Sequence, residues 1–107
     1  MRIMDRISKL KEFLQLNPGD SFLKHALALE YMKIDDDTTA RSIFEEILTQ
    51  DPGYIGSYYH LGKLLERNGD TNSAIQWYEK GMEEARKAGD NHALGELRSA
   101  YEELVDG

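Results

Sequence analysis

The feature that most constrains the fold of this chain is a repeat, because the sequence matches itself when it is shifted by 34 residues. Pro18-Gly19 falls on Pro52-Gly53, and the shift also aligns acidic, small and leucine positions. These further identities are Glu12 on Glu46, Leu14 on Leu48, Leu27 on Leu61, Asp36 on Asp70, Ala40 on Ala74 and Glu45 on Glu79. A fixed period of this length indicates stacked supersecondary units, none of which can bury its apolar face alone.

Each period predicts two helices. Residues 54–67 carry apolar side chains at helical spacing, and so do residues 71–88. Between them, Asn68-Gly69-Asp70 predicts a helix that ends at the glycine and a second that starts at an aspartate cap, and Gly89-Asp90 repeats this signal. In the first period, the expected caps and helix ends are Asp20 or Ser21 with Lys33, and Asp36 or Asp37 with Gln50.

These residues resemble the tetratricopeptide repeat, a helix–turn–helix with the pattern W-x2-L-G-x2-Y, then A-x3-F, then P. The first period reads Lys24-x2-Leu27-Ala28-x2-Tyr31, then Ala40-x3-Phe44 and Pro52. The second reads Tyr58-x2-Leu61-Gly62-x2-Leu65, then Ala74-x3-Tyr78, with Arg86 in place of the final proline. The small residues stand where helices would cross, because a larger side chain would hold the helix axes apart.

The resemblance implies an all-α fold of antiparallel helix–turn–helix repeats, stacked as a short right-handed α-solenoid of about six helices. We expect a single domain over residues 1–107. Within it we expect a half-repeat helix at 2–16, one repeat at 20–53, a second at 54–88 and a capping helix at 90–105. The last helix is placed as a cap because it leaves the strict 34-residue register.

Composition excludes several classes of function. The net charge of −7 argues against nucleic acid as a partner, since nucleic-acid binding needs a positive surface. The absence of cysteine excludes disulfides and thiolate metal sites. The first residues do not read as a signal peptide, and no window approaches the ~20 apolar residues of a membrane-spanning helix. We therefore expect a soluble, cytoplasmic protein with no cofactor and no membrane partner.

Catalytic and metal motifs are also missing from the sequence. No G-x-S-x-G, P-loop or H-E-x-x-H motif is present, and we expect no enzyme activity. The run Asp35–Asp37, with Thr39 and Glu46, has the spacing of an EF-hand calcium loop, but Ala40 stands where that loop needs glycine. We interpret these aspartates as helix caps. His25 and His60 lack a third ligand of suitable type, so we expect no metal site.

The resemblance implies binding of a peptide or helix from another protein along the concave groove. By the family pattern, the lining residues would be Phe22, His25, Leu29, Met32, Tyr59, His60, Lys63 and Arg67. A peptide with an apolar anchor and an acidic end is expected to suit this set. The alternative is that these side chains pack against neighbouring helices. The lysine–asparagine clamp of chaperone-binding repeats is not matched, because its positions fall at His25, Leu29 and His60.

Assembly is the second hypothesis for function. Ile3, Met4 and Ile7 lie on a first helix that lacks the helix preceding it in a full repeat. A solenoid normally ends in a polar cap, so this apolar edge could pair two copies or dock into a larger partner. We expect a protein that is mostly monomeric and forms a weak homodimer. The sequence does not identify the protein partner.

Overall fold

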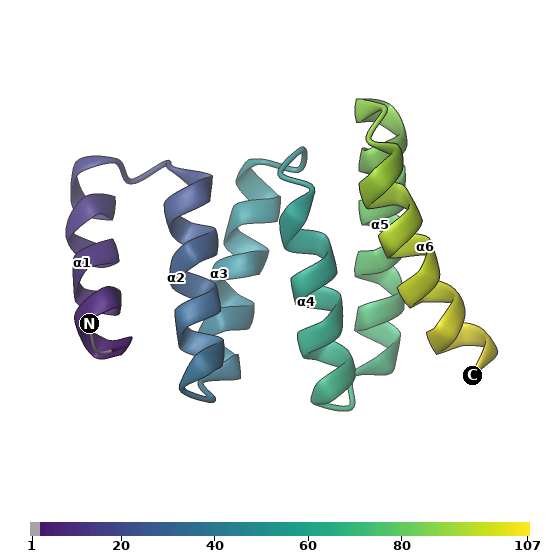
Figure 1. Cartoon of the computed structure of the whole chain (residues 1–107), viewed down its shortest axis with the longest axis horizontal. Coiled ribbons are helices and arrows are strands. Elements are labelled where there is room, and N and C mark those ends of the chain that lie inside the picture. Colours follow the sequence, from purple (N-terminus) through teal and green to yellow (C-terminus); the bar gives the residue numbers. More distant parts are fainter. Residues whose placement is uncertain (1–2) are drawn as a thin grey trace. The chain divides into compact units, whose positions relative to one another are not determined.

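The computed structural model describes the backbone of residues 3–107 and the side chains of residues 4–107. In this described part, all regular structure is helical (Figure 1). The helices are α1 (Ile3–Leu16), α2 (Ser21–Lys33), α3 (Asp37–Gln50), α4 (Gly56–Arg67), α5 (Thr71–Ala88) and α6 (Asn91–Asp106). The expected all-α fold of helical repeats is confirmed.

The chain divides into two compact units, Met1–Asp51 and Pro52–Gly107, which we call unit 1 and unit 2. In unit 1, α1 packs on α2 and α2 packs on α3. In unit 2, α5 packs on both α4 and α6, and α4 also touches α6. Consecutive helices within each unit run antiparallel (Figure 1). The division falls close to the expected junction between the two repeats, after Gly53.

Four aspartates cap the N-termini of helices, as the sequence predicts. The backbone N–H three residues further on donates to each carboxylate, over 3.0 Å at Asp20 and Asp90, 3.2 Å at Asp36 and 3.3 Å at Asp70. These bonds satisfy N–H groups that have no partner within the helix. The caps of α2 and α3 are therefore Asp20 and Asp36 rather than the residues that follow them.

The helix ends need a left-handed backbone at three positions. Gly69 has φ 81° and Gly89 has φ 69°, in the region that glycine adopts without penalty. Asp35, which the repeat aligns with Gly69, has φ 62°. A residue with a Cβ is strained in this region, so the first repeat carries a backbone cost that the second avoids.

The core of unit 1 contains a buried carboxylate. Glu30 is 2% exposed, and its Oε1 lies 2.8 Å from Nε of Arg6 on α1. Lys33, one turn further along α2, brings its Nζ to 3.3 Å. An unpaired carboxylate would be costly at this depth. The ion pair with Arg6 avoids that cost and joins α1 to α2. The apolar core around it consists of Ile7, Leu27, Ala28, Ala40, Phe44, Ile47 and Leu48.

The core of unit 2 is built on two buried tyrosines. Tyr58 and Tyr78 are both 0% exposed. The Tyr58 hydroxyl donates to the Pro52 carbonyl at 2.6 Å, and the Tyr78 hydroxyl donates to the Glu66 carboxylate. Burial and the nearby carboxylate raise the pKa of Tyr78 far above its ordinary value, so the phenol remains a donor. Gly62 lies directly against the Tyr78 ring, where the family pattern places a glycine.

Lys24 stands in the first repeat at the position where the second repeat has a buried tyrosine. It aligns with Tyr58 and is 8% exposed. Its Nζ lies 2.8 Å from Oε1 of Gln50 and 3.5 Å from Oε1 of Glu46, both on α3. The lysine stem therefore fills space between α2 and α3 while its ammonium group is satisfied at the surface.

Candidate functional site

A surface groove lies between α4 and α6 in unit 2. It consists of two adjoining hollows, of about 230 Å³ and 310 Å³, which share Tyr59 and Glu96 in their linings. The first is also lined by Lys63, Ser99, Ala100 and Glu103, and the second by Ile55, Gly56, His60, Ala93 and Leu97. We call these residues together the α4–α6 groove.

Helix geometry brings these side chains together. Ile55, Tyr59 and Lys63 follow one another at intervals of four residues, so they form one ridge along α4. Glu96 and Glu103 are two turns apart on α6 and share a face of that helix. Small residues at Gly56, Ala93 and Ala100 leave the space between the ridges open, and nothing lies within 4 Å of a Cβ built at Gly56.

The α4 wall of the groove carries aromatic rings and one lysine. The His60 ring meets Tyr59 edge-on at 6.0 Å between ring centroids, and Nζ of Lys63 lies 5.8 Å from the Tyr59 ring centroid. Lys63 Nζ is also 3.6 Å from Oε2 of Glu66, on its own helix. The lysine charge is thus partly neutralised by Glu66, which itself accepts from the Tyr78 hydroxyl.

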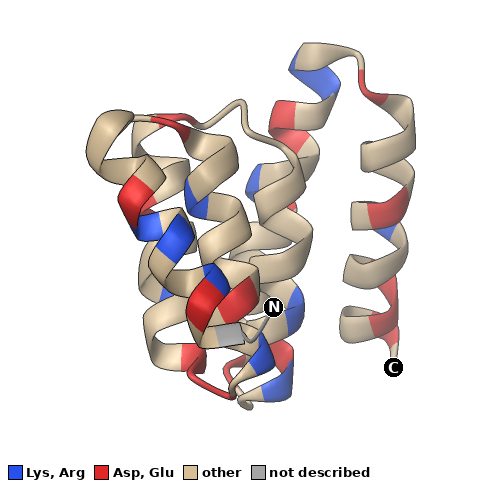
Figure 2. Ribbon diagram, turned by 60° about the vertical axis from the view of Figure 1, so that its left-hand side comes forward, with Lys and Arg blue, Asp and Glu red and all other residues tan. Residues whose placement is uncertain are grey.

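The α6 wall is acidic. Glu96 and Glu103 are both exposed, and acidic positions recur along α6 (Figure 2). Oε1 of Glu96 lies 3.5 Å from Nε2 of His92, which carries a charge only when protonated. At neutral pH, the carboxylates on this wall therefore outweigh the one lysine on the other.

His60 lines the hollow of about 310 Å³ and has a shifted pKa. Burial lowers its pKa below the ordinary value of 6.5, and the carboxylate of Glu96 opposes part of this change. His60 is accordingly neutral at pH 7. A neutral imidazole can both donate and accept a hydrogen bond, so it adds polarity to the groove without adding charge.

Three of the predicted site residues, Tyr59, His60 and Lys63, line the groove. Arg67 is exposed at the end of α4 and does not line either hollow. The α6 residues were not predicted as part of the site, because their helix was interpreted only as a cap. The recurrence of Glu96, Ser99 and Glu103 on one helical face was the available signal.

The other predicted groove residues belong to α2 in unit 1. Phe22 is 68% exposed, and His25 packs edge-on against the buried Phe44 at 5.5 Å between ring centroids. Leu29 and Met32 are half-buried. His25 thus packs partly against a neighbouring helix, as the alternative interpretation expected, whereas Phe22 remains available at the surface.

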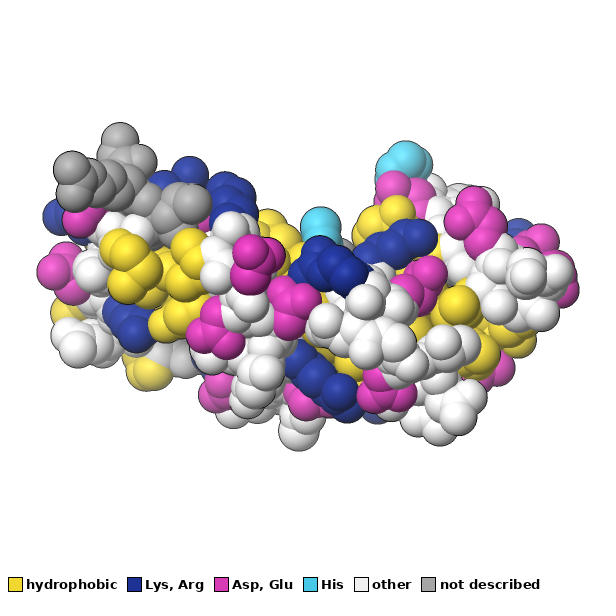
Figure 3. Space-filling view, turned by 90° about the horizontal axis from the view of Figure 1, so that it is seen from below, with side chains coloured by type: hydrophobic (Ala, Val, Ile, Leu, Met, Phe, Trp, Pro, Cys, Tyr) yellow, Lys and Arg dark blue, Asp and Glu magenta, His cyan; other side chains and the backbone are white. Residues whose placement is uncertain are grey.

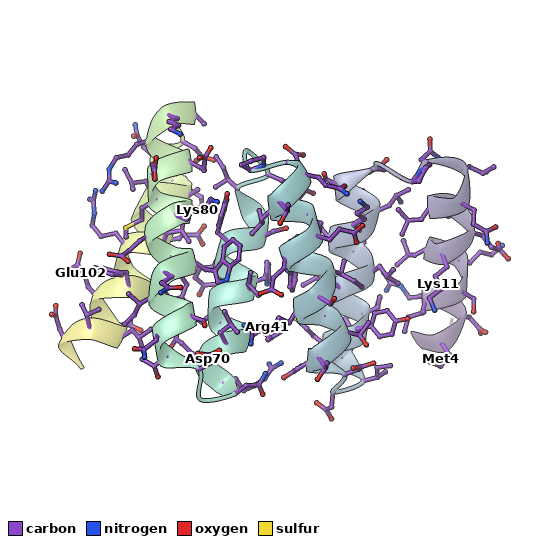
Figure 4. The ribbon with its side chains drawn as sticks, turned by 180° about the vertical axis from the view of Figure 1, so that it is seen from behind. Met4, Lys11, Arg41, Asp70, Lys80 and Glu102 are labelled. Atoms are coloured by element: carbon purple, nitrogen blue, oxygen red, sulfur yellow. The ribbon has the colours of Figure 1, made fainter. Side chains whose placement is uncertain are left out.

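The structure corrects the prediction of which residues form the apolar edge of α1. Ile7 is only 3% exposed and cannot contribute to an accessible edge, and the side chain of Ile3 lies outside the described residues. Met4 is 61% exposed and lies near the start of α1 (Figure 4). Phe13 and Leu16, which were not predicted, are 50% and 80% exposed. Hydrophobic side chains are accordingly visible on the surface at the α1 end of unit 1 (Figure 3).

The acidic and histidine side chains of the chain do not form a metal site in the described residues. Over the described part of the chain, no group of three or more histidine, aspartate or glutamate side chains is arranged to hold a metal ion. Asp36 acts as the cap of α3, and its Oδ2 also accepts from the Thr39 hydroxyl at 2.8 Å. Among the same residues, no helix has the length and apolar character needed to cross a membrane.

Comparison with known families identifies the fold. Residues 35–99 match the family model described as the tetratricopeptide repeat, which covers more than half of the chain. The chain belongs to the tetratricopeptide repeat family. The match spans α4 and α5 entirely and reaches into α6, so it includes most of the α4–α6 groove of this tetratricopeptide repeat protein.

Individual relatives agree with this assignment. The crystal structure of a tetratricopeptide repeat domain protein from Salinibacter ruber is 44% identical, with a TM-score of 0.77, over 81% of this chain and 97% of that one. The TPR2B domain of yeast Sti1, in its complex with pHsp70, has a TM-score of 0.85 at 13% identity and covers 94% of this chain and 80% of its own, so it shows the fold alone. Human aspartyl/asparaginyl beta-hydroxylase is 30% identical over 74 residues, 69% of this chain. The chain spans about 10% of that enzyme's length.

Proposed function

We propose that this protein is a non-catalytic interaction module that binds a segment of another protein in the α4–α6 groove. The observation that carries this proposal is the pair of adjoining hollows, which place an aromatic ring, a histidine and two carboxylates around an open floor. Concave sites with apolar surface and a few convergent polar groups are typical of binding sites. Tyrosine is also among the residue types that most often contribute binding energy.

The relatives support an interaction role. Membership of the tetratricopeptide repeat family favours protein binding over catalysis, and the Sti1 domain of the same fold is in a complex with pHsp70. At 13% identity this likeness concerns the fold and does not specify the same partner here. The predicted absence of enzyme activity remains a prediction, which a screen of hydrolase substrates would test.

Affinity capture from a native extract would test the groove. Tyr59→Ala removes the side chain shared by both hollows, and we expect it to lower the yield of captured partners about tenfold. Tyr101→Ala is the matched control, because Tyr101 is a half-buried tyrosine on α6 that does not line the groove. Equal capture by the wild type and Tyr59→Ala, with both proteins folded, would refute the proposed site.

The exposed apolar side chains of α1 favour a second candidate function, which is self-association. Phe13 lines a hollow of about 320 Å³ with Arg6, Lys9 and Leu10, and its ring is half-exposed. We propose that a second copy of the chain covers this face weakly. Sedimentation velocity over a concentration series should show a dimer that Phe13→Ser removes and Phe22→Ser, at an exposed phenylalanine of α2, retains. A wild-type protein that is monomeric at every concentration would rule this candidate out.

A further inference from the structure

We propose that the α4–α6 groove selects a peptide segment in which a lysine or arginine lies next to an aliphatic or aromatic side chain. This inference rests on the proposed function and names the chemistry of the partner. It differs from the expectation drawn from the sequence, which was a peptide with an acidic end.

The charge of the groove argues for a basic residue. Glu96 and Glu103 line the hollow of about 230 Å³, opposite Lys63. The ammonium group of Lys63 already lies 3.6 Å from Glu66 and over the Tyr59 ring, so its charge does not neutralise the α6 carboxylates alone. A lysine or arginine of a bound peptide could pair with either of the α6 carboxylates, whereas an acidic residue would be repelled by them.

Unit 2 as a whole reinforces this preference. The acidic positions along α6 continue beyond the groove at Glu102 and Asp106. Glu102 projects from the helix surface (Figure 4), and charged side chains of this kind attract a basic segment from a distance. The attraction acts over roughly a Debye length, about 8 Å at physiological salt, so it should weaken as salt is added.

The second hollow argues for an apolar neighbour. The half-buried Ile55 and Ala93 contribute apolar surface to the hollow of about 310 Å³, which Tyr59 and the buried Leu97 also line. This volume is at the lower end of the range for ligand sites, so it suits one side chain better than a large cofactor. Leucine, isoleucine, methionine and phenylalanine would each bury apolar surface there.

The sharing of residues sets the spacing of the two side chains. Tyr59 and Glu96 line both hollows, so the two hollows are neighbours. The basic and apolar side chains of the ligand must therefore be close in its sequence. His60, which is neutral at pH 7, also lines the apolar hollow.

Selection from a random peptide display library against the intact chain would test this preference. We expect enriched peptides to pair Lys or Arg with an adjacent aliphatic or aromatic residue. Binding of one enriched peptide, labelled with fluorescein, would then be measured by anisotropy, beside versions with its basic residues replaced by Gln or Glu. We expect the Gln version to bind about threefold more weakly per replaced residue, and the Glu version to bind more weakly still.

Variants of the protein would assign the effect to the groove. Glu96→Gln and Glu103→Gln should each raise the Kd of the basic peptide about threefold, and the double variant about tenfold. Glu102→Gln is the matched control for attraction at a distance, since Glu102 is an exposed carboxylate of the same helix that does not line the hollows, and it should weaken binding less than Glu103→Gln does. All three positions are exposed, so these variants should fold as the wild type does.

The outcomes separate this inference from the function on which it rests. Enrichment of acidic peptides, or a basic preference that Glu102→Gln weakens as much as Glu103→Gln does, would overturn the inference. If such peptides still lost affinity with Tyr59→Ala, the groove would remain the binding site. Peptides whose affinity is unchanged by Tyr59→Ala would overturn both proposals.

Discussion

Replacement of Gly62 by alanine should destabilise this protein, although alanine is the better helix former. An ideal Cβ at Gly62 would lie 2.5 Å from Cζ and 2.7 Å from Cδ1 of the Tyr78 ring. The ring has little freedom to move away, because Tyr78 is 0% exposed and its hydroxyl is hydrogen-bonded to Glu66. Either the tyrosine must leave its position or α4 must move away from α5.

The two opposing effects can be weighed. Overpacking of a filled core typically costs 1–3 kcal/mol, and an overlap of this depth with an anchored ring belongs near about 3 kcal/mol. Higher helix propensity returns about 1 kcal/mol. The net loss in free energy of unfolding is therefore about 2 kcal/mol, which corresponds to a fall in Tm of roughly 10 °C for a domain of this size.

Gly95→Ala is the matched control, because Gly95 lies inside α6 with nothing within 4 Å of its added Cβ. It should raise the stability by about 0.5–1 kcal/mol. Urea unfolding can be followed by the fluorescence of Trp77, the one tryptophan of the chain, which lies 6.2 Å from the Tyr58 ring between centroids. If Gly62→Ala were as stabilising as Gly95→Ala, the close packing of α4 on α5 would be refuted. A double-mutant cycle with Tyr78→Leu should show that much of the Gly62→Ala cost depends on this ring.

Further predictions concern the backbone and the ionised groups. Asp35→Gly should raise the free energy of unfolding by about 1 kcal/mol in a urea titration, because φ 62° strains an aspartate where the second repeat has Gly69. Burial lowers the pKa of His60 below 6.5, so the unfolded chain takes up its proton first and stability should fall as the pH drops through 6.5 and below. Urea titrations at pH 7.5 and 5.5 should show a smaller fall for His60→Gln. Arg6→Met should cost about 2 kcal/mol, because the Glu30 carboxylate, which is 2% exposed, would lose its ion pair with α1 and keep the one with Lys33, and a second change of Glu30 to Gln should recover part of this loss in thermal unfolding.

The helices were predictable because their signals are local. An aspartate cap needs only the N–H groups of the following turn, and a glycine end needs only its own backbone. The four caps at Asp20, Asp36, Asp70 and Asp90 therefore define helix starts without knowledge of the packing. Asp35 is the exception, because an aspartate does not by itself predict a positive φ. Only the alignment of Asp35 with Gly69 indicates this conformation.

Only one wall of the candidate site was predictable, because the other wall depends on contacts that are not local in the sequence. The α4 wall followed from the family pattern, whereas the α6 wall depends on which face of a helix outside the 34-residue register meets α5. The prediction of an apolar edge on α1 was wrong at Ile7 for the same reason. Ile7 lies on the stripe that packs inward, and Phe13 lies on a different face. The rotation of a helix about its axis is set by long-range contacts, which a single amphipathic pattern does not fix.

An arginine distinguishes α6 from α4, the helix whose pattern it partly repeats. With a shift of 36 residues, the Tyr58-x2-Leu61-Gly62-x2-Leu65 pattern of α4 aligns with Leu94-x2-Leu97-Arg98-x2-Tyr101. Leu97 is buried as Leu61 is, but an exposed arginine stands in the position of Gly62. Gly62 is the position at which the Tyr78 ring of α5 packs directly on α4, so a helix could not pack on α6 in the same manner without burying the Arg98 side chain. The chain thus keeps the leucine that packs α6 onto α5 and changes the residue that would admit another helix. Glu96 and Glu103 lie on another face of α6 from Arg98 and are exposed beside the space that the proposed ligand needs.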